Sequence, residues 1–148
     1  MTTPDTPEQA VPLLHQQICF PLYAASNLIV RSYGPLLKPL GLTYPQYLVM
    51  MLLWEKPELS VGELGEALHL DSGTLTPLLK RLESNGLVNR RRCNEDERRV
   101  LVSASEQGQA LRAEAALVQQ QMACRLGEDL PWLLELKTDL HKLIRLLD

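Results

Sequence analysis

The sequence predicts a mainly α-helical chain that carries one small β-hairpin. Apolar residues make up 45% of the 148 residues but aromatic residues only 5%, and this balance favours packed helices over a sandwich of aromatic strands. Apolar residues recur at helical spacing over most of the chain, whereas between residues 87 and 103 the period changes to two. A chain of this length can bury a core without disulfides or metals.

A first helical segment is expected over residues 14–40, where apolar residues recur every three or four positions. They are Leu14, Ile18, Leu22, Ala25 and Ile29. Pro21 lacks the N–H that would bond to the preceding turn, so we expect it to kink or divide this helix. Residues 1–12 contain three prolines and no basic segment, which predicts a flexible lead rather than a secretory signal.

Capping signals mark the starts of the next three helices. Thr43–Gln46 and Ser60–Glu63 read as capping boxes, in which the first and fourth residues bond each other's backbone N–H groups. A tight turn follows at His69-Leu70, after which Asp71 or Ser72 caps a helix that runs to Ser84.

Two short strands with a polar tip follow, over residues 87–92 and 99–103. A long helix is then expected from about Glu106 to Leu126, where Gly127 breaks it. The last helix carries leucines spaced three and four apart, which are Leu133, Leu136, Leu140, Leu143 and Leu147. This row is either an intramolecular core stripe or a dimer seam, and periodicity does not distinguish the two.

Two short capped helices, a tight turn and a basic hairpin together predict a winged helix-turn-helix, a DNA-binding unit. The net charge of −3 argues against DNA binding, but residues 80–99 hold seven basic and four acidic side chains, a local charge of +3. The alternative is a helical hairpin with a solvated run of charge.

The recognition helix is expected to be Ser72–Ser84. Its small hydroxyl side chains would let the backbone approach a major groove, and Lys80 and Arg81 would meet phosphates. Arg98 would enter a minor groove, with its guanidinium oriented by Asp96. The full set of expected DNA-binding residues is Ser72, Thr74, Thr76, Lys80, Arg81, Arg90, Asp96, Arg98 and Arg99.

Three stretches resemble the MarR family of winged-helix repressors, and within it the OhrR group of organic hydroperoxide resistance regulators. They are LTYPQYLVMMLLWE, LDSGTLTPLLKRLESNGLVNRRR and DERRVLVSASEQG. The resemblance implies one domain over 13–148, in which 13–42 and 106–148 supply interleaved dimerisation helices and 43–105 the DNA-binding lobe. It also implies a homodimer that reads a pseudo-palindromic duplex.

Cys19 is the candidate redox sensor. A thiol on a helix is more often an inert apolar residue, and only a stabilised thiolate reacts with peroxide. Tyr33 and Tyr44 follow at offsets of 14 and 25, which match the tyrosines that hydrogen-bond the reactive sulfur in the OhrR pattern. Tyr23 and Tyr47 are expected to be core residues.

Cys124 resembles the resolving cysteine of two-cysteine members, which would capture oxidised Cys19 as a disulfide. Cys93 is expected to be a tolerated exposed residue. Three cysteines without a CxxC pair indicate a reduced cytoplasmic protein, and no apolar run is long enough to span a membrane.

The sequence predicts no metal site, cofactor or catalytic set. His15 and Cys19 are four residues apart, but no second pair has ligand spacing. The expected function is a repressor that leaves its operator when organic hydroperoxide oxidises Cys19. The alternatives are a MarR-type regulator released by a small aromatic ligand with Cys19 incidental, and a thiol peroxidase using Cys19 and Cys124, for which the basic hairpin would have no purpose.

Overall fold

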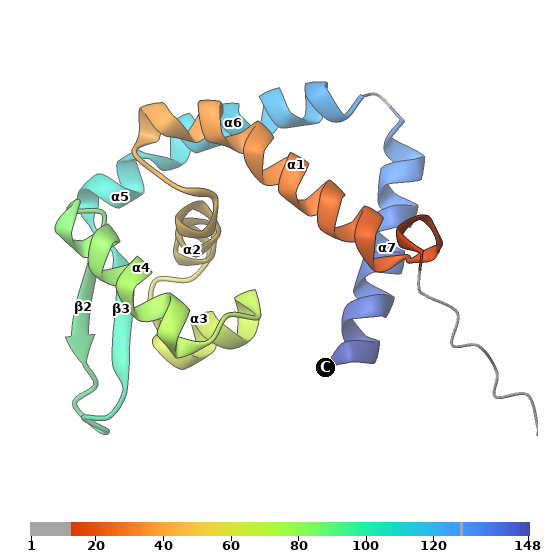
Figure 1. Cartoon of the computed structure of the whole chain (residues 1–148). Coiled ribbons are helices and arrows are strands. Elements are labelled where there is room, and N and C mark those ends of the chain that lie inside the picture. The colour runs from red at the N-terminus through yellow and green to blue at the C-terminus, as the bar shows by residue number, and fades with distance from the viewer. Residues whose placement is uncertain (1–12, 128) are drawn as a thin grey trace, which may run out of the picture.

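A computed structural model of the chain describes residues 13–127 and 129–148 (Figure 1). The lead expected over 1–12 lies outside these residues. The helices are η1 (Leu14–Gln16), α1 (Cys19–Leu37), η2 (Lys38–Leu40), α2 (Tyr44–Glu55), α3 (Val61–Leu68), α4 (Ser72–Ser84), α5 (Glu106–Ala110), α6 (Arg112–Leu126) and α7 (Leu130–Leu147). The strands are β1 (Leu59–Ser60), β2 (Val88–Arg92) and β3 (Val100–Ala104). The predicted fold class, mainly helical with a small hairpin, is confirmed.

The helices of the central region begin where their caps predict. Gln46 Oε1 accepts the backbone N–H of Thr43 at 3.0 Å, and Ser60 and Glu63 bond each other's backbone N–H groups. Asp71 caps α4 by accepting the N–H of Thr74 at 2.7 Å. Each cap satisfies donors that the first turn of a helix leaves free.

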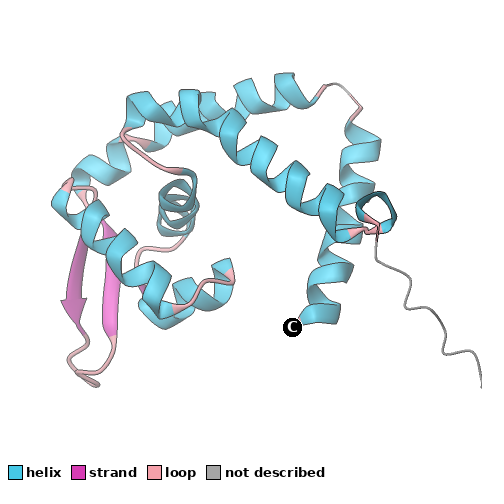
Figure 2. Ribbon diagram, viewed as in Figure 1, coloured by secondary structure: helices cyan, strands magenta, loops and turns pink. Residues whose placement is uncertain are grey.

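Most of the buried core lies in the lobe formed by α2, α3, α4 and the sheet, whereas α1, α6 and α7 form an extended arm (Figures 1 and 2). Leu37 of α1 and Ala115 and Val118 of α6 extend the core to the base of this arm. The sheet is antiparallel in the order β1-β3-β2, and Val102 at its centre is fully buried. Helix α7 buries none of its residues. No helix in the described ranges combines the length and the apolar character that a bilayer span requires.

Two of the expected helices have different bounds. Pro21 neither kinks nor divides α1, because the helix begins only at Cys19 and the proline lies in its first turn, where the missing N–H has no partner to lose. The single helix expected from Glu106 is interrupted at Leu111, which separates α5 from α6. Strand β1 was not predicted, since two residues carry no alternating pattern.

Gly108 marks the point where α5 meets the lobe. Its carbonyl accepts the Trp54 indole N–H at 2.9 Å, and a Cβ built on it would lie 2.1 Å from the Leu87 carbonyl oxygen. Gly108→Ala should therefore lower the unfolding temperature by roughly 5 to 10 °C, as overpacking does. Gly34→Ala is the control, because nothing lies within 4 Å of that Cβ. Equal thermal unfolding of the Gly108 variant and the parent would show that this contact is not tight.

Candidate DNA interface and thiol site

Helix α4 has one buried and one exposed face. Leu75, Leu79 and Leu82 are fully buried against the lobe. The opposite face is exposed and carries the expected DNA-binding residues of this helix, which are Ser72, Thr74, Thr76, Lys80 and Arg81. An exposed helix with small side chains at its start and basic ones near its end has the form of a recognition helix.

The hairpin of β2 and β3 projects from the lobe as a wing, with register pairs that run from Val88–Ala104 to Arg92–Val100. Arg98 is exposed at its tip. The expected pairing of Asp96 with the Arg98 guanidinium is wrong. Asp96 Oδ1 instead accepts the backbone N–H of Arg98 at 3.0 Å, because a carboxylate two residues upstream in a tight turn meets that N–H first.

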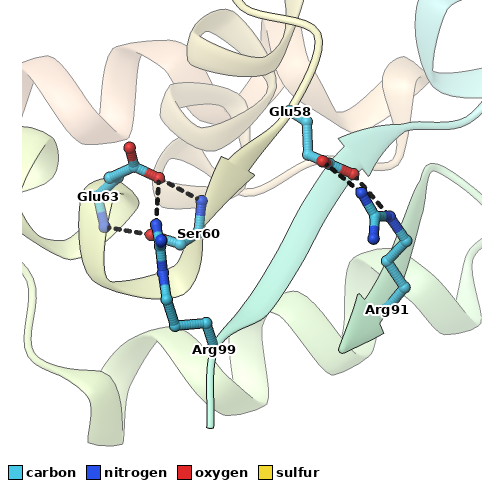
Figure 3. A network of polar contacts seen from close by, with 5 residues as sticks. All are labelled: Glu58, Ser60, Glu63, Arg91 and Arg99. Atoms are coloured by element: carbon cyan, nitrogen blue, oxygen red, sulfur yellow. Dashed lines mark hydrogen bonds and ion pairs between the residues drawn. The ribbon is translucent and has the colours of Figure 1, made fainter. Parts of the chain in front are cut away.

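Three wing arginines pair with acids of the lobe. Arg90 donates to Glu83 of α4 at 2.9 and 2.6 Å, and Arg91 donates through two nitrogens to Glu58 at 3.0 and 2.8 Å (Figure 3). Arg99 lies 3.6 Å from Glu63, whose pKa is lowered chiefly by the backbone N–H of Ser60 (Figure 3). Arg90 and Arg99, both expected to contact DNA, are thus engaged within the chain.

The sequence does not predict these three pairs, because each joins residues of different segments; Glu58 and Arg91, for example, are 33 residues apart. The sequence does predict the orientation of two of the arginines, since the twofold period of a strand places Arg90 and Arg91 on opposite faces. A groove of about 400 Å³ lies between the start of α3, α4 and the wing, and Thr76, Arg98 and Arg99 are among its lining residues.

The two candidate tyrosines lie together. The ring centroids of Tyr33 and Tyr44 are 4.7 Å apart, and burial raises the pKa of both, so their hydroxyls stay protonated and able to donate. Tyr47 is a core residue with 2% of its surface exposed, as predicted, but the same expectation for Tyr23 is wrong, since 67% of it is exposed.

Cys19 is exposed at the start of α1, away from these tyrosines within one chain. Tyr33 follows 14 residues later in the same helix, which corresponds to about 21 Å along its axis. Cys124 is exposed near the end of α6, where neighbouring Arg125 donates to the Ser32 carbonyl at 3.2 Å. That places it about 20 Å from Cys19 along α1, beyond disulfide reach.

The arm exposes an extensive apolar surface. Its exposed large apolar residues come from α1, α6 and α7 and include Tyr23, Leu28, Ile29, Val30, Leu117, Leu126, Trp132, Leu136, Leu140 and Ile144. The leucine row of α7 is not an intramolecular core stripe, because no residue of that helix is buried. An apolar surface of this extent is typical of a protein interface.

The known proteins that this chain resembles in sequence and in structure are transcriptional regulators. Residues 31–115 match the family model described as transcriptional regulator SarA/Rot. The organic hydroperoxide resistance transcriptional regulator of Bacillus subtilis is 47% identical over 137 residues, which cover 90% of this chain and 91% of that protein. A cysteine-to-serine mutant of MarR from Escherichia coli has a TM-score of 0.68 at 27% identity, covering 86% of this chain and 96% of that one.

AbfR of Staphylococcus epidermidis is also similar. Its reduced form bound to DNA has a TM-score of 0.79 at 33% identity, covering 91% of this chain and 95% of that one. AbfR has further been solved in an overoxidised form bound to DNA and in a disulfide form, with TM-scores of 0.74 and 0.67. The chain belongs to the MarR family of winged helix-turn-helix transcriptional regulators, in the group of the organic hydroperoxide resistance regulators.

Proposed function

We propose that the chain is a cytoplasmic repressor that binds a pseudo-palindromic duplex as a homodimer and leaves it when an organic hydroperoxide oxidises Cys19. The observation that carries this proposal is the exposed Cys19 thiol on the apolar arm of a chain that is similar along most of its length to a named hydroperoxide regulator. In this account residues 13–42 and 106–148 form the dimerisation unit, and 43–105 the DNA-binding lobe.

On DNA, helix α4 would enter the major groove with Ser72, Thr74 and Thr76 toward the bases. The exposed Arg98 at the wing tip would enter the neighbouring minor groove. Lys80 and Arg81 are exposed farther along α4, where they would contact phosphates and so contribute affinity without selecting sequence.

Lys80→Ala should weaken binding to operator and to unrelated duplexes by similar factors. It should also reduce the slope of log affinity against log salt by about one unit per subunit, because one phosphate contact and its released counterion are lost. Binding is measured by fluorescence anisotropy between about 50 and 200 mM salt. Lys38→Ala is the control, since Lys38 is exposed outside the lobe. An unchanged slope in the Lys80 variant would remove this residue from the interface.

The proposed sensor is assembled between subunits. Because about 21 Å of helix separates Cys19 from Tyr33 in one chain, the hydroxyls that stabilise its thiolate would come from Tyr33 and Tyr44 of the partner subunit. The thiolate attacks the hydroperoxide, which leaves a sulfenic acid and an alcohol. The Cys124 thiol of the other subunit then attacks the sulfenic sulfur, forming a disulfide and releasing water.

The disulfide, rather than oxidation as such, is the proposed signal for release. AbfR has been solved on DNA in an overoxidised form, and its disulfide form has been solved as well. A disulfide holds its two Cα atoms within about 7 Å, and we expect the arms to shift as the bond forms, a movement that would displace the wings and recognition helices of the dimer.

Tyr33→Phe combined with Tyr44→Phe should leave operator affinity unchanged and slow Cys19 oxidation by about tenfold or more. The rings remain in place, but the thiolate loses its hydrogen bonds from the two hydroxyls. A hydrogen bond to a charged group contributes about 1.5–3 kcal/mol. Stopped-flow oxidation with cumene hydroperoxide measures the rate, with Tyr23→Phe as the control because Tyr23 is exposed outside the pair. A double variant that oxidises at the parental rate would leave the two tyrosines as packing residues.

One experiment separates the sensor from its two rivals. The operator complex is titrated with cumene hydroperoxide, and peroxide consumption is followed in parallel with a thiol reductant. The proposal predicts release at a near-stoichiometric dose with no sustained turnover. Continued turnover would indicate a thiol peroxidase, and DNA binding that is indifferent to hydroperoxide would indicate a regulator controlled by a small ligand.

A further inference from the structure

Strand β2 is the edge strand of the wing, and it forms an ion pair on each of its two faces. In the order β1-β3-β2, strand β2 has a neighbour on one side only. Arg90 and Arg91 point to opposite faces of it. On one face Arg90 pairs with Glu83 of α4, and on the other Arg91 pairs with Glu58. Glu83 therefore links β2 to the recognition helix, and Glu58 links it to the segment that precedes β1.

The Glu58–Arg91 pair crosses the whole sheet (Figure 3). Arg91 lies opposite Leu101 of β3, and Leu101 lies opposite Ser60 of β1. Glu58 directly precedes β1, so Arg91 must reach across β3 to contact it, and it does so with two nitrogens at 3.0 and 2.8 Å. Since β1 leads straight into α3, this pair connects the outer strand of the wing to the first helix of the helix-turn-helix.

We infer that Glu58 is a positioning residue for operator recognition, and the inference rests on the proposed function. It contacts no DNA itself. It sets the angle of the wing so that Arg98 meets a minor groove while α4 occupies the major groove. Arg91 is then a structural partner of Glu58 rather than a phosphate ligand. Glu63 is less suited to this test because it also caps α3 through Ser60.

A positioning role and a purely electrostatic role of Glu58 predict opposite changes in DNA affinity when its charge is removed. Glu58 is an acid close to the basic wing, so removing its charge should raise affinity for a polyanion if charge alone matters. If Glu58 positions the wing, removing it should lower affinity for the operator only. An exposed ion pair shifts an equilibrium by a factor of up to about five, and both wings of a dimer engage one operator. We therefore expect a loss of about tenfold.

The experiment compares Glu58→Gln with Glu95→Gln, which removes the same charge from the exposed wing tip. The probes are a duplex selected by the reduced parent protein from a random library and an unrelated duplex. Glu58→Gln should bind the selected duplex about tenfold more weakly, with unchanged affinity for the unrelated duplex and unchanged thermal unfolding. Glu95→Gln should not weaken either. The exchanged pair Glu58→Arg with Arg91→Glu should recover most of the loss.

Glu58→Gln binding the selected duplex as tightly as the parent, or more tightly, would overturn the inference. So would equal losses on both duplexes, or an exchanged pair that recovers nothing. Failure of the proposed function would appear in the parent instead, as equal affinity for the two duplexes or as no response to hydroperoxide. The two failures are therefore distinguishable in one series of measurements.

Discussion

Cys19→Ser should bind the operator with parental affinity and should not be released by any dose of organic hydroperoxide. Serine preserves the size of the side chain, so the arm and the lobe keep their geometry. Its alcohol is not ionised at neutral pH and is not oxidised by hydroperoxide, because the reaction requires a thiolate. The measurement is operator anisotropy during titration with cumene hydroperoxide, in which the parent loses its signal and the variant keeps it.

Two further cysteine variants are matched to this one. Cys93→Ser should respond like the parent, because Cys93 lies in the wing rather than on the arm, where its backbone N–H donates to the Arg99 carbonyl at 2.8 Å. Cys124→Ser should form the sulfenic acid and then the sulfinic acid, but it should keep the operator bound because the disulfide cannot form. Release of Cys19→Ser by hydroperoxide would show that another group is the sensor.

Leu136→Glu combined with Leu140→Glu should abolish operator binding. The two leucines have 39% and 37% of their surface exposed on an α7 that buries nothing within its own chain, so a dimer partner is expected to cover them. Burying the surface that each leucine still exposes contributes about 1 kcal/mol, twice over in a symmetric dimer, and buried unpaired carboxylates add a large cost. Reading two half-sites requires both subunits.

Sedimentation and gel shift measure this outcome together. The double glutamate variant should sediment as a monomer or unfold, and it should give no shifted band. Thr138→Glu with Lys142→Glu is the control, because both positions lie on another face of α7 and already carry polar side chains exposed to solvent. A folded monomer of the leucine variant with full operator affinity would contradict the dimer account.

The elements that sequence predicts well are those whose signals are local. The caps at Thr43, Ser60 and Asp71 bond backbone groups within one turn, so their effect is visible in four consecutive residues. The wing is visible as a twofold period beside a basic run. The recognition helix Ser72–Ser84 has the bounds that these signals predict.

Pairings between distant segments could not be predicted. Glu58 and Arg91 meet across the sheet because β3 pairs with both β1 and β2, and no periodicity in the sequence encodes that strand order. Asp96 and Arg98 are neighbours in sequence, yet the turn geometry gives the carboxylate to a backbone N–H rather than to the guanidinium. In both cases the partner of the carboxylate depends on which N–H donors the folded backbone places nearest to it.

The assembly of the thiol site is also beyond what the sequence alone predicts. Offsets in sequence relate Cys19 to Tyr33 and Tyr44 but do not say which chain supplies each group. The length of α1 answers part of this question, because a rigid helix keeps Cys19 and Tyr33 of one chain about 21 Å apart. Only an arrangement of two chains can then bring the thiol and the hydroxyls together, and the uncovered apolar arm is consistent with such an arrangement.

The most direct test of the central claim follows DNA release and cysteine chemistry in one sample. Operator-bound protein receives increasing cumene hydroperoxide up to one equivalent per subunit, a dose too small for overoxidation. Anisotropy reports the bound operator, while mass spectrometry under non-reducing conditions reports each cysteine. The account predicts that release rises in step with the disulfide between Cys19 of one subunit and Cys124 of the other. Release while Cys19 stays reduced, or a complete Cys19–Cys124 disulfide with the operator still bound, would contradict it.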